Sequence, residues 1–249
     1  MTVGEADDPA GRLEALVLAA GAGARFGGGK LLASWNGGVL LDGALAAAFA
    51  APVRRVTVVW GADPRVADAA QTFAGAAGQA ARLGLAHAVA HARGLSQSLK
   101  AGVEHLAADC AGVFVFLGDM PRAPHALAGP MAQALAAGAP AVAATFAGRR
   151  GHPVLFSRAL FPALMSLTGD RGAGAILAGL GPALVEIAAT DDGVLFDVDR
   201  PGDLTPSSSS GLTRGRGGPD PNCRSPPNPH DDPASDPRVK PEGDEERGI

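Results

Sequence analysis

The sequence predicts the α/β fold class, as a single Rossmann-like three-layer α/β/α domain built on a predominantly parallel mixed sheet. Short apolar runs alternate with Ala-rich helix-like segments through most of the chain, a pattern typical of such a sheet. Hydrophobic residues make up 47% of the 249 residues, which is enough for a sizeable core. A glycine-rich loop follows the first apolar run, as in domains that bind phosphates. We expect this domain to span residues 13–205.

Each expected strand is a short apolar run, and each expected helix is a longer segment of good helix formers. The expected strands are Ala15–Leu18, Val56–Trp60, Ala86–Ala90, Val113–Leu117, Ala141–Thr145, Val154–Phe156, Leu184–Ile187 and Leu195–Val198. The expected helices are Leu41–Ala50, Pro64–Ala74, Ser96–Ala107, Pro124–Ala137, Arg158–Leu167 and Gly172–Leu180. Ligands of open α/β sheets gather at the carboxyl ends of the strands, so the polar residues there are the functional candidates.

The two ends of the chain differ from the domain in composition. Residues 1–12 are acidic and lack the apolar segment of a secretion signal, so a flexible N-terminus and a cytoplasmic location are expected. From Pro206 onward the chain is dense in Pro, Ser, Gly, Asp and Arg and almost free of large apolar side chains. Such a segment cannot offset its ordering entropy by burial, so residues 206–249 are expected to form a disordered tail.

Composition and charge argue against several classes of protein. A net charge of −4 without a broad basic surface argues against nucleic-acid binding. No apolar segment reaches membrane-spanning length without Gly, Pro or charge, so no membrane partner is expected. Two cysteines, Cys110 and Cys223, support neither a disulfide framework nor a Cys-based zinc site. Cys110 is expected to be a small buried apolar residue.

The segment LVLAAGAGARFGGGK, from Leu16 to Lys30, is an apolar run that ends abruptly in a glycine-rich loop. Glycine permits positive φ and close approach of the backbone, so successive N–H groups can converge on anionic oxygens. Arg25 and Lys30 add full positive charge. The loop therefore predicts binding of a polyphosphate, with the Gly21–Gly29 amides lining the pocket.

Two familiar phosphate-binding loops match this segment poorly. A Walker A loop requires Gly where Ala24 stands and Ser or Thr where Leu31 follows the Lys. The dinucleotide fingerprint accommodates Gly21 and Gly23, but Phe26 occupies the position of a small residue that lets helix and strand pack closely. An NAD site is therefore a poor alternative.

Aspartates follow two further predicted strands. Asp119 ends the apolar run GVFVFLGD before a Met-Pro turn, and Asp199 follows the predicted strand Leu195–Val198. Proteins bind Mg²⁺ through one or two carboxylates together with substrate phosphates, so this pair predicts a Mg²⁺ site across the cleft. Asp197 would share a sheet face with Asp199 and is the alternative ligand. A turn or helix cap is the alternative role for each aspartate.

The loop LAAGAGARFGGGK, from Leu18 to Lys30, resembles that of nucleotidyltransferases with a molybdopterin-guanylyltransferase-like fold, a nucleotide-diphospho-sugar transferase-like architecture. The turn at Asp119 and the segment DVDRPGDL around Asp199 resemble the metal-binding positions of that family. Three further segments resemble those of the molybdenum cofactor cytidylyltransferases in particular. They are GLSQSLKAG from Gly94, GRRGHPVLF from Gly148 and LTGDRGA from Leu167. Together the matching segments span residues 14–204.

This resemblance implies a reaction and a set of site residues. The implied reaction transfers CMP from CTP to molybdenum-molybdopterin with Mg²⁺ and releases pyrophosphate; a molybdoenzyme or its maturation chaperone is the implied partner. The implied catalytic residues are Arg25, Lys30 and Asp119. The implied nucleotide-binding residues are Leu18, Ala19, Ala20, Gly21, Gly23, Arg25, Lys30, Ser98 and Asp119. The implied metal ligands are Asp119 and Asp199, and the implied acceptor-binding residues are His152, Asp170 and Arg171.

Several of these residues have a structural alternative. Ser98 lies at a helix start, so its hydroxyl is equally a helix cap or a group that contacts a pyrimidine base. His152 lies between Gly151 and Pro153, where it would face the acceptor or stabilise the loop through a hydrogen bond. Asp170 and Arg171 would bind the phosphate of the acceptor or cap a helix.

Other reactions remain open. Guanylyl transfer from GTP uses the same scaffold, and Ala20 favours cytosine because the guanylyl branch characteristically has Gly at that position. Two further alternatives are a sugar-phosphate nucleotidyltransferase and a catalytically silent nucleotide-binding partner in molybdoenzyme maturation. The presence of Arg25, Lys30, Asp119 and Asp199 argues against a silent protein.

Overall fold

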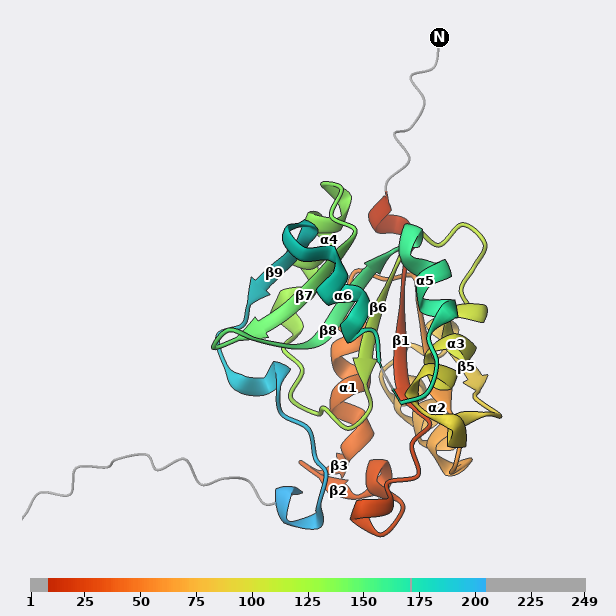
Figure 1. The fold of residues 1–249 in the computed structure, drawn as a ribbon. Helices are drawn as coiled ribbons and strands as arrows, with labels where there is room; N and C mark the ends of the chain where they lie inside the picture. Colours follow the sequence, from red (N-terminus) through yellow and green to blue (C-terminus); the bar gives the residue numbers. More distant parts are fainter. Residues whose placement is uncertain (1–8, 171, 205–249) are drawn as a thin grey trace, which may run out of the picture. The chain divides into compact units, whose positions relative to one another are not determined.

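The computed structural model describes residues 9–170 and 172–204, and a seven-stranded sheet forms its centre. The strands lie in the order β5-β4-β1-β6-β8-β7-β9. Their bounds are Leu13–Ala19 (β1), Arg55–Trp60 (β4), Leu83–His87 (β5), Gly112–Leu117 (β6), Ala141–Phe146 (β7), Arg149–Ser157 (β8) and Leu184–Ala188 (β9). Neighbours pair in parallel except at β8, which is antiparallel to β6 and β7. The carboxyl ends of β1 and β6 therefore lie at one edge of the sheet, the lower edge in Figure 1.

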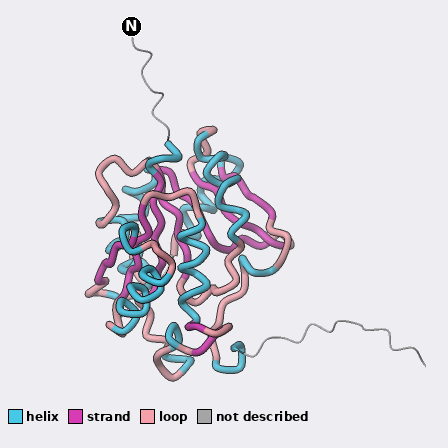
Figure 2. Tube along the Cα trace, turned by 180° about the vertical axis from the view of Figure 1, so that it is seen from behind, coloured by secondary structure: helices cyan, strands magenta, loops and turns pink. Residues whose placement is uncertain are grey.

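Helices cover both faces of the sheet and make it the middle layer of three (Figures 1 and 2). The helices are Leu40–Ala50 (α1), Arg65–Ala76 (α2), Leu95–Glu104 (α3), Ala128–Ala136 (α4), Phe161–Ser166 (α5) and Gly174–Leu180 (α6). One hydrophobic core contains residues of α1, α2 and α4, and the other contains residues of α3, α5 and α6. β1 serves both cores, because alternate side chains of a strand point to opposite faces: Val17 packs into the first and Leu16 into the second. The predicted fold class is confirmed.

Two predicted strands differ from the structure. The strand predicted at Leu195–Val198 is wrong, since these residues form no strand and follow the 3-10 helix Asp192–Val194 (η9). Their apolar character reflects burial without strand pairing: Val198 is fully buried, and its amide donates to the Asp119 carbonyl oxygen at 3.0 Å. The strand predicted at Ala86–Ala90 lies at Leu83–His87 instead, because the chain turns after His87 and leaves Val89 exposed.

A short hairpin, formed by Ser34–Trp35 (β2) and Gly38–Val39 (β3), is absent from the predicted elements. Its turn is Asn36-Gly37, and both residues have positive φ. An Asn-Gly pair is the strongest short-range sequence signal for a hairpin. Trp35 packs against Phe196 with ring centroids 6.0 Å apart, and the Arg122 guanidinium lies 4.8 Å from the centre of the same ring. The hairpin thus supports the segment that leads to Asp199.

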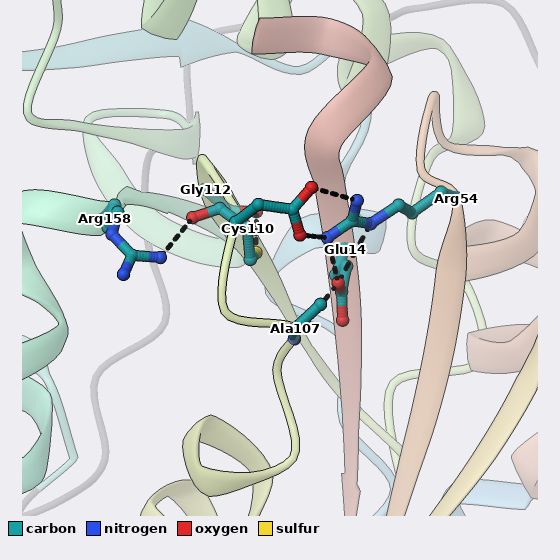
Figure 3. Close-up of polar contacts among 7 residues, drawn as sticks. Glu14, Arg54, Ala107, Cys110, Gly112 and Arg158 are labelled. Carbon is teal, nitrogen blue, oxygen red and sulfur yellow. Dashed lines mark hydrogen bonds and ion pairs between the residues drawn. The ribbon is translucent and has the colours of Figure 1, made fainter.

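A polar cluster lies around Glu14, near the amino end of β1 and away from the carboxyl edge (Figure 3). Glu14 is 1% exposed, and its Oε1 accepts hydrogen bonds from Arg54 Nε and Nη2 at 3.0 and 2.9 Å and from the Ala107 amide at 3.3 Å. Arg54 also pairs with Asp109. Cys110 is buried, and burial raises the pKa of its thiol to about 11. The cluster ties β1 to the loops that precede β4 and β6.

Residues 1–8 of the expected flexible N-terminus and the tail expected at 206–249 lie outside the described residues. Pro9–Arg12 form a 3-10 helix directly before β1. The described residues belong to one compact unit. Within them, no helix combines the length and apolar character needed to cross a membrane.

Candidate active site

The glycine-rich loop leaves the carboxyl end of β1 and runs along the edge of the sheet. The chain is buried up to Ala20 and becomes exposed at Gly21. Four glycines of the loop have φ between +62° and +96°: Gly23, Gly27, Gly28 and Gly29. Residues other than glycine rarely adopt this backbone conformation. The amides of Phe26 and Gly28 donate to the Gly23 carbonyl oxygen, and the Gly27 amide donates to that of Ala24. These three amides therefore close turns within the loop, contrary to the expectation that the amides from Gly21 to Gly29 all face a ligand.

The four charged residues predicted for the site form ion pairs with one another. Lys30 Nζ lies 2.7 Å from Asp119 Oδ2 and 3.4 Å from Asp199 Oδ1. Arg25 Nη1 lies 3.2 Å from Asp199 Oδ2. The Lys30 side chain is only 12% exposed, whereas that of Arg25 is 78% exposed, so the Arg25–Asp199 pair is weaker than the Lys30–Asp119 pair. The fold thus joins three distant chain segments in one charged centre.

Backbone hydrogen bonds place Asp119 and Asp199 together. The Gly118 amide donates to the Leu18 carbonyl oxygen at 2.9 Å, which continues the β1–β6 pairing up to Asp119. The Val198 amide donates to the Asp119 carbonyl oxygen and brings the next residue, Asp199, alongside. Asp203 accepts hydrogen bonds from the amides of Asp199 and Arg200, and these bonds lower the pKa of Asp203. A loop, not a strand, therefore supplies Asp199.

Asp197 lies close enough to Asp119 and Asp199 to interact with their negative charges. Burial, followed by repulsion from Asp119 and Asp199, raises the pKa of Asp197. Asp197 lines a cavity of about 330 Å³ together with Arg149 and Phe196, and neither Asp119 nor Asp199 lines that cavity. Lys30 contacts Asp199 and Asp119 directly, so the geometry favours Asp199 over Asp197 as the partner of Asp119.

A cavity of about 340 Å³ lies between the end of β1, the start of α3 and the Asp119 turn; we call it the first cavity. Six of the predicted site residues line it: Leu18, Ala20, Gly21, Ser98, Asp119 and Asp170. Its volume is within the range of small-ligand sites. The structure thus brings most of the predicted nucleotide-binding residues to one hollow beside the charged centre.

The loop that carries Asp170 closes over the start of α3. The Ser96 amide donates to the Gly169 carbonyl oxygen at 3.3 Å. Gly94 has φ +113°, and a Cβ added there would lie 2.5 Å from Asp170 Oδ1, so the close approach requires glycine. Asp170 and Ser98 therefore line the same cavity.

His152, on β8, lines a second cavity of about 230 Å³. Most of the wall is apolar, with Leu99, Val115 and Leu177 among its residues. Burial lowers the pKa of His152 to about 4, so the imidazole is neutral at neutral pH. The second cavity shares Leu18, Leu95 and Leu117 with the first, so the two adjoin.

Some predicted residues lie elsewhere. The Ala19 side chain packs into the core on the α1 side of the sheet. Gly23 supports Lys30, since a Cβ added at Gly23 would lie 3.0 Å from the Lys30 Cβ. Arg171 lies outside the described residues. Conversely, His91 lines the first cavity but is not among the predicted site residues, although its position shortly after β5 is a strand-end signal.

The donor atoms at the charged centre suit a divalent cation. Oxygens of Asp119 and Asp199 already converge on one cationic group, the Lys30 ammonium. Within residues 9–170 and 172–204 there is no group of three or more His, Cys, Asp or Glu able to hold a metal. Two carboxylates completed by substrate phosphates are the arrangement in which proteins commonly hold Mg²⁺.

Solved structures share this architecture. Rv0371c from Mycobacterium tuberculosis H37Rv is 25% identical with a TM-score of 0.63, over 78% of this chain and 96% of that chain. Its homologue from Mycobacterium sp. strain JC1 is 25% identical with a TM-score of 0.60, over 77% and 92%. A nucleotidyl transferase from Methanothermobacter (Mth528) shares the fold at 21% identity and a TM-score of 0.60, over 77% and 94%. The fold is thus shared with a nucleotidyl transferase.

A family model described as a MobA-like NTP transferase domain matches residues 15–187, from β1 into β9. This chain belongs to that family. Divalent metals are typical of nucleotidyltransferases, and Rv0371c has also been solved in complex with manganese, a structure 22% identical with a TM-score of 0.54 over 72% of this chain and 88% of that chain. No curated protein matches the chain.

Proposed function

We propose that this chain transfers CMP from CTP to the terminal phosphate of molybdenum-molybdopterin, with Mg²⁺ as its metal. The observation that carries the proposal is the pair of adjoining cavities, one of which reaches Asp119. A group transfer between two substrates requires sites that hold both reactants in contact. The first cavity would take the nucleotide, and the second would take part of the acceptor.

The reaction needs charge stabilisation rather than a protein nucleophile. An oxygen of the acceptor phosphate attacks the α-phosphorus of CTP, the bond from that phosphorus to the bridging oxygen breaks, and pyrophosphate leaves. Lys30 and Arg25 would stabilise the negative charge on the departing pyrophosphate. Mg²⁺ held by Asp119 and Asp199 would neutralise charge on the substrate phosphates.

Two residues of the first cavity support cytosine as the base. Ala20 is 2% exposed, and a Cβ added at the neighbouring Gly61 would lie 2.9 Å from the Ala20 Cβ, so this wall is tightly packed. Ser98 is buried within the first turn of α3 and lines the cavity, where its hydroxyl would contact a pyrimidine edge. A pyrimidine needs less room than a purine beside Ala20. We therefore expect Ala20→Gly to raise kcat/KM for GTP relative to CTP.

The second cavity supports an acceptor with an uncharged ring system. Its wall is mostly apolar, and the neutral His152 imidazole offers one donor and one acceptor to a heterocycle. The expected binding of acceptor phosphate by Asp170 has little support, because this carboxylate faces the first cavity. A molybdoenzyme or its maturation chaperone would receive the product.

Pyrophosphate release with molybdenum-molybdopterin and each of CTP, GTP, ATP and UTP tests the proposal. We expect turnover with CTP at the highest kcat/KM. A preference for GTP would replace cytidylyl by guanylyl transfer on the same site. Asp119→Asn is the matched control, because it keeps the shape of the side chain and removes its charge. Release equal to that of Asp119→Asn with all four nucleotides would refute transfer to molybdenum-molybdopterin and favour the sugar-phosphate nucleotidyltransferase or the silent partner.

A further inference from the structure

The Lys30 side chain is held in place by the loop that presents it. Lys30 opens the 3-10 helix Lys30–Leu32 (η3), directly after Gly29, and the next residue, Leu31, is buried in the core. Gly23 lies close to the Lys30 Cβ, since a Cβ added at Gly23 would lie 3.0 Å from it. With a side chain that is 12% exposed, the ammonium is directed inward and is poorly screened by solvent.

This ammonium contacts the oxygens that the proposed metal would use. It donates to Asp119 Oδ2 at 2.7 Å and contacts Asp199 Oδ1 at 3.4 Å. A divalent cation on the same oxygens would lie within a few ångströms of the ammonium, and like charges repel strongly in a partly buried site. Metal binding and the present Lys30 contacts therefore oppose each other.

A triphosphate removes the conflict, because it supplies new anionic partners for the ammonium. We infer that Lys30 is a positioning residue that makes metal binding depend on the triphosphate. The ammonium exchanges Asp119 and Asp199 for phosphate oxygens when the nucleotide arrives, and the carboxylates then accept the metal. By linkage the dependence is reciprocal, so the metal strengthens triphosphate binding by the same factor. This inference rests on the proposed nucleotidyl-transfer site.

Arg25 takes a smaller part in the exchange. Its guanidinium pairs with Asp199 at 3.2 Å, but the side chain is 78% exposed and its charge is screened. Lys30, which contacts both carboxylates from a protected position, carries most of the dependence.

Lys30→Met tests the inference, because Met keeps the length of the stem and removes the cation. The first measurement is the affinity for Mn²⁺ alone, from the electron paramagnetic resonance signal of the free ion. The second is the affinity for tripolyphosphate without metal, by calorimetry in EDTA. We expect Mn²⁺ to bind at least about tenfold more tightly, and tripolyphosphate at least about tenfold more weakly, than in the unmodified chain. The inference predicts a gain in affinity for Mn²⁺ and a loss of affinity for tripolyphosphate. Simple damage to the loop would instead lower both affinities.

Three further variants complete the test. Lys100→Met removes the same charge from α3, and both affinities should stay unchanged. Lys30→Arg keeps a cation and should keep weak Mn²⁺ binding. Adding Asp119→Asn to Lys30→Met should abolish the gain in Mn²⁺ affinity.

The outcomes separate this inference from the proposed function. Unchanged or weaker Mn²⁺ binding in a folded Lys30→Met variant would overturn the inference, as would an equal gain in Lys100→Met. Neither measurement uses CTP or the acceptor, so the base preference and the transfer reaction are unaffected by such a result. If Asp119→Asn leaves Mn²⁺ binding intact, the metal is not held at Asp119, which overturns the inference together with the proposed metal site.

Discussion

Arg54→Met should destabilise the protein more than any other single change in the polar cluster around Glu14. The substitution leaves the Glu14 carboxylate, which is 1% exposed, without the guanidinium that donates to it at 2.9 and 3.0 Å. Removing one partner of a buried ion pair typically costs about 3–5 kcal/mol, because the other charge remains buried and unpaired. We expect about 3 kcal/mol, near the lower limit, because the Arg54 side chain is itself 32% exposed.

The same cluster offers two graded comparisons. Glu14→Gln should cost less, because Arg54 would keep its contacts with Asp109. Asp109→Asn should cost least, because the Asp109 side chain is 56% exposed and its pairing with Arg54 is screened. The expected order of destabilisation is therefore Arg54→Met, then Glu14→Gln, then Asp109→Asn.

Urea unfolding monitored by circular dichroism measures these differences, with an unchanged slope as the sign that only stability has changed. A loss of about 3 kcal/mol corresponds to a fall of roughly 6–12 °C in the melting temperature of a domain of this size. If Asp109→Asn lowers the free energy of unfolding as much as Arg54→Met does, burial of Glu14 does not control the cluster, and the reasoning fails.

Three further predictions concern the site. Gly94→Ala should lower the free energy of urea unfolding by about 1–3 kcal/mol and raise the nucleotide KM, because φ of Gly94 is +113° and the added Cβ would lie too close to Asp170. The control is Gly75→Ala in α2, which has open space around it and should be neutral or slightly stabilising. An equal loss of stability in Gly75→Ala would contradict the argument. The pKa of His152 falls from 6.5 to about 4 on folding, so the unfolded chain binds more protons than the folded chain between these pH values. The free energy of unfolding should therefore decrease as the pH falls through this range. A His152→Asn variant with the same pH dependence of stability would exclude His152 as the cause. Asp119→Asn should lower kcat/KM at least about a hundredfold while the urea midpoint shows a folded protein, and near-normal turnover at saturating Mg²⁺ would remove Asp119 from the metal site.

The hairpin at Trp35 has a clear sequence signal for its turn, but its strands have no hydrophobic pattern that predicts them. Asn36-Gly37 is a two-residue turn with positive φ at both positions, and its strands are only two residues long. Strands this short produce no apolar alternation, so a search for hydrophobic runs misses them. The Asn-Gly pair is the local sequence signal that predicts this element.

The segment Leu195–Asp199 shows the opposite failure. Leu195, Phe196 and Val198 are apolar because they pack against the core, and a run of apolar residues does not distinguish a buried loop from a buried strand. The position of Asp199 beside Asp119 was nevertheless anticipated. It arises from the Val198–Asp119 backbone hydrogen bond rather than from a strand end.

The sequence by itself determined the α/β class, the glycine-rich loop after β1 and the placement of Asp119 at a strand end, because each depends on residues close together in the chain. Only the tertiary structure decided that Lys30 pairs with Asp119 and Asp199, that Asp170 faces the first cavity, and that His152 is neutral in the second. These properties depend on distances and burial between segments as many as 169 residues apart in the chain. Such contacts are set by how the strands and loops pack together, which no local pattern encodes.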